Sequence, residues 1–84
     1  MSPRQLAREV RKFELPVVPG LEYSQREVDD LVSRTVSGLE GKGPAVDRRE
    51  IASFLSTPTL SPPGYDSSSA KVFLTNLFGL MGRI

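Results

Sequence analysis

The sequence predicts an all-α fold of four helices, arranged as two short-helix, loop and long-helix repeats packed around one core. Three observations lead to this prediction. Four segments place apolar residues at helical spacing behind a capping residue, and two loops rich in Pro and Gly separate short helices from long ones. A stretch that begins at Tyr23 also has a second copy 42 residues on, at Tyr65. With 84 residues, the chain is expected to form one domain, 1–84.

The first helix is expected to begin after Ser2, with Pro3 at its first position and Gln5 completing a capping box. Its apolar stripe consists of Leu6, Val10 and Phe13. The opposite face is basic and carries Arg4, Arg8, Arg11 and Lys12. That face is either an ordinary solvated surface, which we favour, or a contact for lipid headgroups or an acidic partner.

Pro16 and Pro19-Gly20 end this helix, so residues 14–22 are predicted to form a loop. Three apolar residues lie within it: Val17, Val18 and Leu21. They either tuck into the core, which we favour, or stay exposed as a contact tip.

The second helix is expected to start at a capping box of Ser24 and Glu27. Its stripe follows a helical period: Val28, Leu31, Val32, Val36, Leu39. Asp30 and Arg34 form an acid-first i,i+4 pair. The acids Glu27, Asp29 and Asp30 favour the helix dipole and project in different directions, so we expect no metal site there.

The linker, 40–46, contains Gly41-Lys42-Gly43-Pro44, which lacks the spacing of a phosphate-binding loop. A third capping box, Asp47 with Glu50, is expected to start a short helix with the stripe Ile51, Phe54, Leu55. A second loop runs from Pro58 to Gly64.

Asp66 is expected to cap a fourth helix, whose first turn carries three serines that we interpret as polar sequence rather than a phosphorylation site. Its main seam comprises Ala70, Phe73, Leu74, Leu77, Phe78 and Met81. A weaker second stripe comprises Val72, Leu80 and Ile84. A helix that is apolar on two faces is expected to be central or to lie at a subunit interface.

Composition argues against several classes of function. The chain has no His and no Cys, and its net charge is +1. His and base-activated Cys are the commonest catalytic groups near neutral pH, so we expect no enzyme, no cofactor and no small-molecule substrate. A net charge near zero disfavours nucleic-acid binding. No secretory signal or membrane span is visible, so a cytoplasmic location is expected, with association at the inner face of the membrane left open.

The repeat aligns apolar residues with apolar residues and caps with caps. Phe13 matches Phe54, Pro16 matches Pro58, and Tyr23-Ser24 matches Tyr65-Asp66. In each copy the tyrosine is expected to close its loop over the start of the long helix, facing the Phe that ends the preceding short helix. The tyrosines and phenylalanines are therefore interpreted as core residues.

The unit resembles the DivIVA domain, the N-terminal module of bacterial division-site and cell-pole scaffolds. Residues 3–39 and 47–81 resemble one copy each, and the tandem is similar to short actinobacterial proteins with two DivIVA-type repeats. The signature is shared between the copies: Phe13, Tyr23, Glu27, Val28, Asp29, Phe54, Gly64, Tyr65, Asp66, Phe73 and Leu74. Glu22 stands where the glycine of the first copy belongs, and Ser69-Ala70-Lys71 replaces the acid-Val-acid run in the second.

The resemblance implies an interaction module in cell division or polar growth that binds a protein partner or itself, as in a homodimer. Family members bind curved membrane through an aromatic and a basic residue before the Gly-Tyr. This chain has Gly20-Leu21 and Pro62-Pro63 there, which argues against that route. Candidate contacts with a partner or a membrane are Arg4, Arg8, Arg11, Val17, Val18, Leu21, Val72 and Leu80.

Two alternatives remain open. A peripheral membrane binder would use the basic first helix and the apolar loop tips. A small helical nucleic-acid-binding regulator would use a capped helix pair, although the acids at the start of the second helix disfavour base contacts there.

Overall fold

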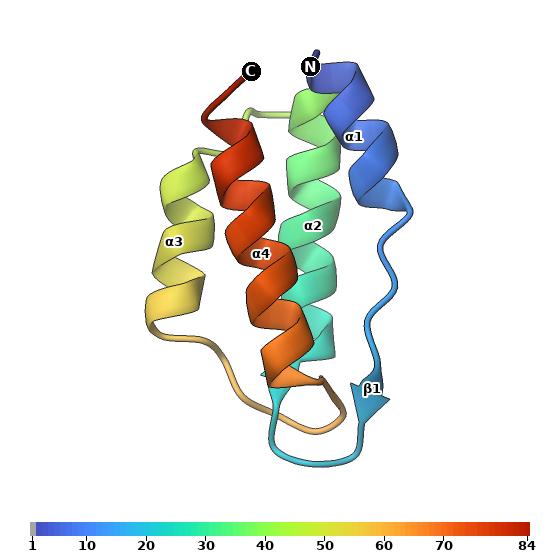
Figure 1. Ribbon diagram of the computed structural model, residues 1–84, viewed down its shortest axis with the longest axis vertical. Helices are drawn as coiled ribbons and strands as arrows, with labels where there is room; N and C mark the ends of the chain where they lie inside the picture. The colour runs from blue at the N-terminus through green and yellow to red at the C-terminus, as the bar shows by residue number, and fades with distance from the viewer. Residues whose placement is uncertain (1) are drawn as a thin grey trace.

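Four helices run along the long dimension of the molecule in the computed structural model, which describes residues 2–84 (Figure 1). They are α1 (Pro3–Arg11), α2 (Gln25–Leu39), α3 (Arg48–Ser56) and α4 (Ser67–Met81). The molecule measures 36 × 23 × 20 Å. Helix α1 packs along α2, and α3 packs along α4. Both termini lie at one end, beside the linker between α2 and α3, and the two long loops lie at the other end.

The caps form largely where the sequence predicts them. The Ser2 hydroxyl accepts from the Gln5 N–H at 3.2 Å, and the Gln5 side chain accepts from the Ser2 N–H at 2.9 Å. Ser24 and Asp66 cap α2 and α4, each accepting from the N–H three residues later. The capping box expected at Ser24 and Glu27 is only half formed, because the Ser24 N–H donates to the Thr59 carbonyl.

The capping box expected for α3 is wrong. The Asp47 carboxylate accepts from the Arg49 N–H at 2.9 Å, two residues on. The Glu50 carboxylate does not return to the cap, because it accepts a hydrogen bond from Arg34 of α2 at 3.0 Å. A tertiary partner has therefore replaced the local one.

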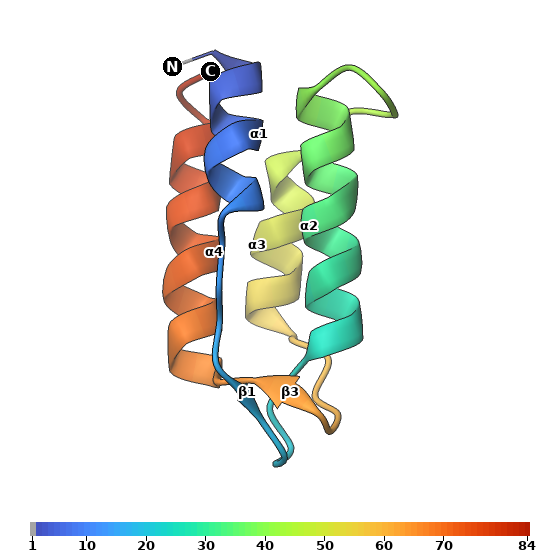
Figure 2. The same cartoon turned by 90° about the vertical axis from the view of Figure 1, so that its right-hand side faces the viewer.

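The prediction of an all-α fold is correct in its four helices and wrong in omitting a small sheet. Three two-residue strands, β1 (Val17–Val18), β2 (Tyr23–Ser24) and β3 (Gly64–Tyr65), pair antiparallel in the order β1-β3-β2. Figure 2 shows the sheet at the end where both loops meet. Strands this short carry no readable periodicity, and they form because the extended segments before α2 and α4 lie side by side and satisfy each other's backbone groups.

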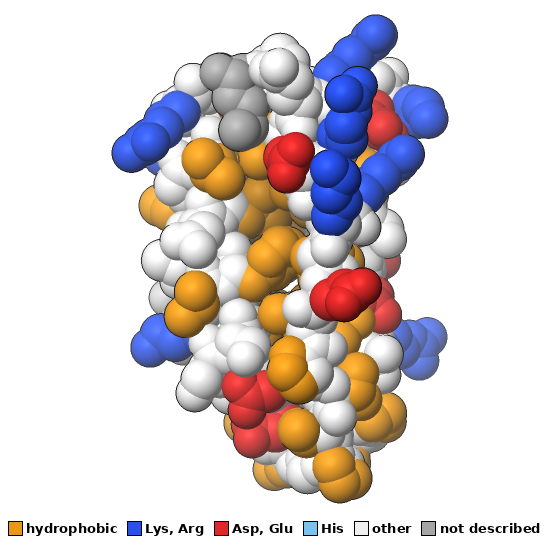
Figure 3. Space-filling view, turned by 45° about the vertical axis from the view of Figure 1, so that its right-hand side comes forward, with side chains coloured by type: hydrophobic (Ala, Val, Ile, Leu, Met, Phe, Trp, Pro, Cys, Tyr) orange, Lys and Arg blue, Asp and Glu red, His pale blue; other side chains and the backbone are white. Residues whose placement is uncertain are grey.

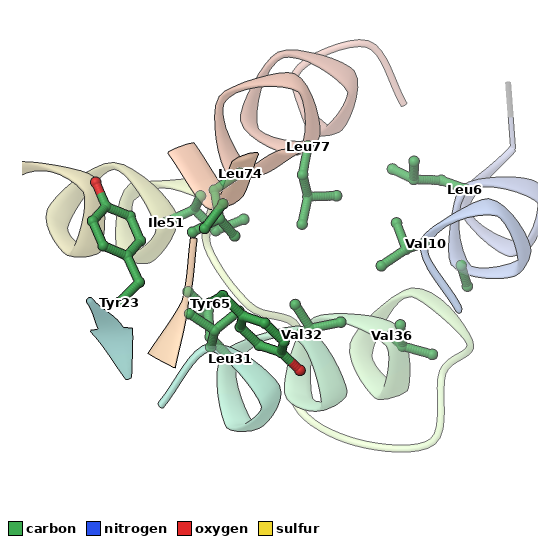
Figure 4. Close-up of a cluster of buried hydrophobic side chains, with 13 residues drawn as sticks. Leu6, Val10, Tyr23, Leu31, Val32, Val36, Ile51, Tyr65, Leu74 and Leu77 are labelled. Carbon is green, nitrogen blue, oxygen red and sulfur yellow. The ribbon is translucent and has the colours of Figure 1, made fainter. Parts of the chain in front are cut away.

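The core lies between the helices and collects most of the predicted stripes (Figure 4). Fully or nearly buried side chains come from every helix: Leu6, Ala7, Val10, Val28, Leu31, Val32, Val36, Ile51, Ala70, Leu74 and Leu77. Leu39, Phe54, Leu55, Phe73, Phe78 and Met81 pack against this cluster while partly exposed. The polar Thr35 is also buried, because its hydroxyl donates to the Leu31 carbonyl at 2.8 Å.

The two aromatic pairs cross between the halves of the chain. Phe13 packs edge-on against Tyr65, with ring centroids 6.2 Å apart, and Tyr23 packs edge-on against Phe54 at 5.7 Å. The expectation that each Phe faces the tyrosine of its own copy is therefore wrong. Both tyrosines are buried as predicted, at 7% and 6% exposed.

Two backbone hydrogen bonds beside the sheet also join the two halves of the chain. The Asp66 N–H donates to the Pro16 carbonyl and the Ser24 N–H donates to the Thr59 carbonyl, both at 2.8 Å. Thr59 thus takes the place that the sequence alignment assigned to Pro58. Thr59 lies five positions after Phe54, whereas Pro16 lies three positions after Phe13, so two extra residues shift the register.

Candidate interaction surfaces

At Gly64, strand β3 approaches the backbone of Glu22 and Tyr23 closely, and we call this contact the crossing. A Cβ atom on Gly64 would lie 2.8 Å from the Tyr23 carbonyl oxygen and 2.9 Å from the Glu22 carbonyl carbon. It would also lie 3.0 Å from the Cβ of Glu22. The crossing therefore has room for one Cβ, which Glu22 supplies. This is a physical reason why the second copy keeps its glycine while the first does not.

Tyr65 is tied to the start of the opposite long helix. Its hydroxyl donates a hydrogen bond to Oδ1 of Asp29 in α2. Burial, followed by this hydrogen bond and the charge of Asp29, raises the pKa of Tyr65 to about 12. Similarly, the Ser67 hydroxyl at the start of α4 donates to the Glu22 carboxylate. Asp29 and Glu22 therefore hold the crossing together and are occupied within the fold.

The loop tips expose apolar side chains at the sheet end of the molecule. Val17 is 50% exposed and Leu21 is 66% exposed, while Val18 is half-buried. The favoured expectation that these residues tuck into the core is wrong for Val17 and Leu21, which stay exposed. Leu60 of the second loop, which sequence reasoning missed, is 45% exposed. Figure 3 shows hydrophobic side chains gathered at this lower end.

A basic hollow lies at the other end, where Figure 3 shows Lys and Arg side chains gathered. Its volume is about 480 Å³, and it is lined by Arg4, Arg8 and Arg11 of α1 with Lys42 of the linker and Glu40. Glu40 lies beneath them with a side chain only 19% exposed, 2.5 Å from Nη2 of Arg11 and 3.7 Å from Nζ of Lys42. The sequence predicted the three arginines on one face, but the contribution of Lys42 and Glu40 depends on the packing of α1 on the end of α2.

The second stripe of α4 does not form one continuous surface. Val72 is 61% exposed and Ile84 is 43% exposed, whereas Leu80 is half-buried against the core. Of the residues considered for a subunit interface on α4, Val72 presents the larger free apolar area.

The three acidic side chains at the start of α2 have different surroundings and do not converge on one point. Glu27 is exposed, Asp29 accepts from Tyr65, and Asp30 pairs with Arg34 at 3.0 Å. Across residues 2–84, no three acidic side chains lie close enough together to hold a metal ion.

Comparisons of the chain with protein-family models, curated proteins and solved structures find no match. The resemblance to DivIVA domains therefore rests on the residues quoted for it. Among residues 2–84, no helix has the length and apolar character needed to cross a membrane.

Proposed function

We propose that this protein is a non-catalytic, DivIVA-like interaction module of bacterial cell division or polar growth, acting through a protein partner or through self-association. Residues 3–39 and 47–81 are its two repeats, and they pair with each other within one chain. The observation that carries the proposal is the crossed arrangement of Phe13 with Tyr65 and Tyr23 with Phe54. It uses the family-like aromatic residues of both copies in equivalent contacts.

The exposed surfaces support an interaction role rather than catalysis. Val17, Leu21 and Leu60 present apolar area at one end, and the basic hollow of Arg4, Arg8 and Arg11 presents charge at the other. Apolar side chains held in solvent by a rigid scaffold are characteristic of surfaces that a partner covers. The sheet and the buried tyrosines supply that scaffold directly beneath the loop tips.

A fluorescent fusion in a rod-shaped actinobacterium tests this proposal. The wild-type fusion is expected to concentrate at division sites or poles, and a Val17→Ser/Leu21→Ser variant is expected to become diffuse. Both changes lie on exposed side chains, so the far-ultraviolet circular dichroism should stay unchanged. A matched control, Ser33→Ala/Ser56→Ala, alters two exposed serines elsewhere and should localise normally. A folded wild-type fusion that is uniformly distributed would overturn the proposal.

A second candidate is a peripheral membrane binder, favoured by the exposure of Val17 and Leu21. These side chains would enter the headgroup region while the arginines of α1 contact anionic lipid. Sedimentation with anionic vesicles at low salt tests it, with neutral vesicles as the control. Pelleting of the wild type, lost in Val17→Ser/Leu21→Ser, supports membrane binding, and absence of pelleting removes it.

A further inference from the structure

The four cations of the basic hollow differ in what holds them. Arg11 and Lys42 share the Glu40 carboxylate, at 2.5 Å and 3.7 Å. Glu40 is the C-cap of α2, a helix that has no basic residue in its own last turn. Positive charge at the carboxyl end of a helix favours the helix dipole. Arg11 and Lys42 therefore have a structural role within the fold.

Arg4 and Arg8 have no comparable role. Both are exposed, and within residues 2–84 neither forms an ion pair. They lie at i and i+4 of α1, so their side chains are neighbours on one face of the helix, with Cβ atoms about 5–6 Å apart. Like charges at this spacing oppose helix formation. The acid of α1, Glu9, pairs with Lys12 at 3.8 Å, which leaves the two arginines without a carboxylate from their own helix.

The hollow beside these arginines has room for a ligand, and Lys and Arg side chains gather around it (Figure 3). Its volume of about 480 Å³ falls within the range of small-molecule sites, about 300–1,000 Å³. Among the described residues that line it, four are cations and Glu40 is the only acid, so its net charge is +3. A ligand of this hollow is therefore expected to be an anion.

A phosphate monoester matches the unpaired charge better than a carboxylate does. It carries a charge of about −1.5 to −2 at pH 7 and has three acceptor oxygens. The guanidinium groups of Arg4 and Arg8 carry two positive charges, and each presents a planar fork of N–H donors that suits two oxygens at once. One carboxylate would neutralise only one of the arginines, whereas one phosphate dianion would neutralise both.

We propose that the basic hollow is a binding site for a phosphate monoester dianion, held between the guanidinium groups of Arg4 and Arg8. The monoester belongs either to a free organic phosphate or to the headgroup of a lipid such as phosphatidic acid, since both present the same group. The site goes beyond the proposed function. It requires neither a protein partner nor the exposed Val17 and Leu21, which lie at the other end of the molecule.

Titration with glycerol 3-phosphate at constant ionic strength, followed by NMR, is the first test. This probe carries the same phosphate group as phosphatidic acid. The backbone amide resonances of α1 are expected to shift and to saturate, while unphosphorylated glycerol at the same concentrations leaves them unchanged. A spectrum that does not respond to glycerol 3-phosphate, from a protein that also ignores phosphatidic acid vesicles, overturns the site.

Substitutions identify the arginines. Arg4→Gln/Arg8→Gln is expected to weaken binding of glycerol 3-phosphate about tenfold or more. Arg4→Lys/Arg8→Lys keeps the charge and loses the planar forks, so its affinity should lie between that of the Gln variant and the wild type.

The control is Arg26→Gln/Arg83→Gln, which has the same net charge as Arg4→Gln/Arg8→Gln. Both control residues are exposed, lie outside the lining of the hollow and form no ion pair within residues 2–84. It is expected to bind like the wild type. Equal loss in this control would mean that net charge alone attracts the ligand, and would overturn the site.

Sedimentation with vesicles separates the two sources of the phosphate. Phosphatidic acid carries a monoester, whereas phosphatidylglycerol carries a diester with a single negative charge, and the two vesicle types are compared at matched surface charge. Pelleting that favours phosphatidic acid and is lost in Arg4→Gln/Arg8→Gln identifies the lipid headgroup. NMR shifts without pelleting identify a free organic phosphate. Equal pelleting with both lipids, and no response to glycerol 3-phosphate, overturns the monoester site, because general attraction to negative charge would then explain the binding.

The loop-tip variant distinguishes this site from the proposed function. Val17→Ser/Leu21→Ser is expected to lose polar localisation and to bind glycerol 3-phosphate as the wild type does. Absence of phosphate binding in a wild type that localises to poles or division sites would overturn the site and leave the proposed function standing.

Discussion

The two halves of the chain share a backbone plan and differ in what they expose. Each has a nine-residue helix, an extended tyrosine segment and a fifteen-residue helix: α1, β2 and α2 in the first, and α3, β3 and α4 in the second. Helix α2 buries five side chains and directs charges outward. Helix α4 buries three and leaves Val72 in solvent. The cap, the tyrosine and the apolar seam are thus sufficient for the plan, while the outer residues of each half are free to build different surfaces.

The halves also differ at the crossing where they meet. The first half places Glu22 at the contact and the second places Gly64 there. The hydroxyl of Tyr65 finds Asp29 on the opposite helix, whereas the residue that aligns with Asp29 in the other half is Lys71. Two similar units packed against each other need not be identical at the contact, because a single glycine or a single carboxylate can serve both.

The largest expected effect comes from adding a Cβ atom to Gly64 at that crossing. Gly64→Ala places a Cβ against backbone atoms of Glu22 and Tyr23, which cannot move aside as a flexible side chain can, and is expected to destabilise the fold by about 3 kcal/mol. Urea unfolding followed by circular dichroism measures it. Gly20→Ala is the control, since nothing lies within 4 Å of its Cβ position. Equal midpoints for the two variants would show that the crossing is looser than described.

The aromatic pairs offer a direct comparison between the halves. Phe13 contacts two aromatic rings, Tyr65 at 6.2 Å and Phe73 at 4.9 Å. Among residues 2–84, Phe54 contacts one aromatic ring, that of Tyr23. Phe13→Ala is expected to lower the free energy of unfolding by about 2.5 kcal/mol, and Phe54→Ala by about 1 kcal/mol less. A cost for Phe54→Ala equal to or greater than that for Phe13→Ala would contradict the difference between the halves.

The tyrosine hydroxyls sharpen the comparison further. Tyr65→Phe leaves the half-buried Asp29 carboxylate without its donor, so it is expected to cost about 1.5 kcal/mol. Tyr23→Phe is expected to cost less, since no hydrogen bond to a carboxylate is lost. The same urea experiment measures both variants, and a larger loss for Tyr23→Phe would reverse the assignment.

A pH dependence of stability is expected from Tyr65, although it has no effect near neutral pH. The pKa of Tyr65 is raised to about 12, above the ordinary value of 10, so folding favours its neutral form. The resulting stability is complete below pH 10 and declines as the pH rises from 10 towards 12. Titration of phenolate absorbance in a Tyr23→Phe variant should have its midpoint near 12, and a further Asp29→Asn change should lower it. An unshifted midpoint near 10 would contradict the burial and bonding of this hydroxyl.

Much of the fold could be predicted from local signals. Ser2, Ser24 and Asp66 cap helices where the sequence placed them, and the seams of α1 and α2 face the core. The site was predicted less completely. The row of arginines on α1 follows from its period, but Lys42 and Glu40 reach it only because α1 packs along α2. The exposure of Leu60 and Leu21 at the loop tips follows from no local pattern.

The sequence by itself determined the number of helices, where each begins and most of their inward faces, because capping and apolar periodicity act between residues within one or two turns. Two residues placed in helical stripes, Phe13 and Ile84, lie beyond the ends of α1 and α4. Only the tertiary structure decided that Phe13 meets Tyr65 and that Tyr23 meets Phe54. It also decided that β3 lies between β1 and β2, and that Lys42 and Glu40 join the arginines of α1. These features depend on contacts between residues that are distant in the chain, which no local pattern specifies.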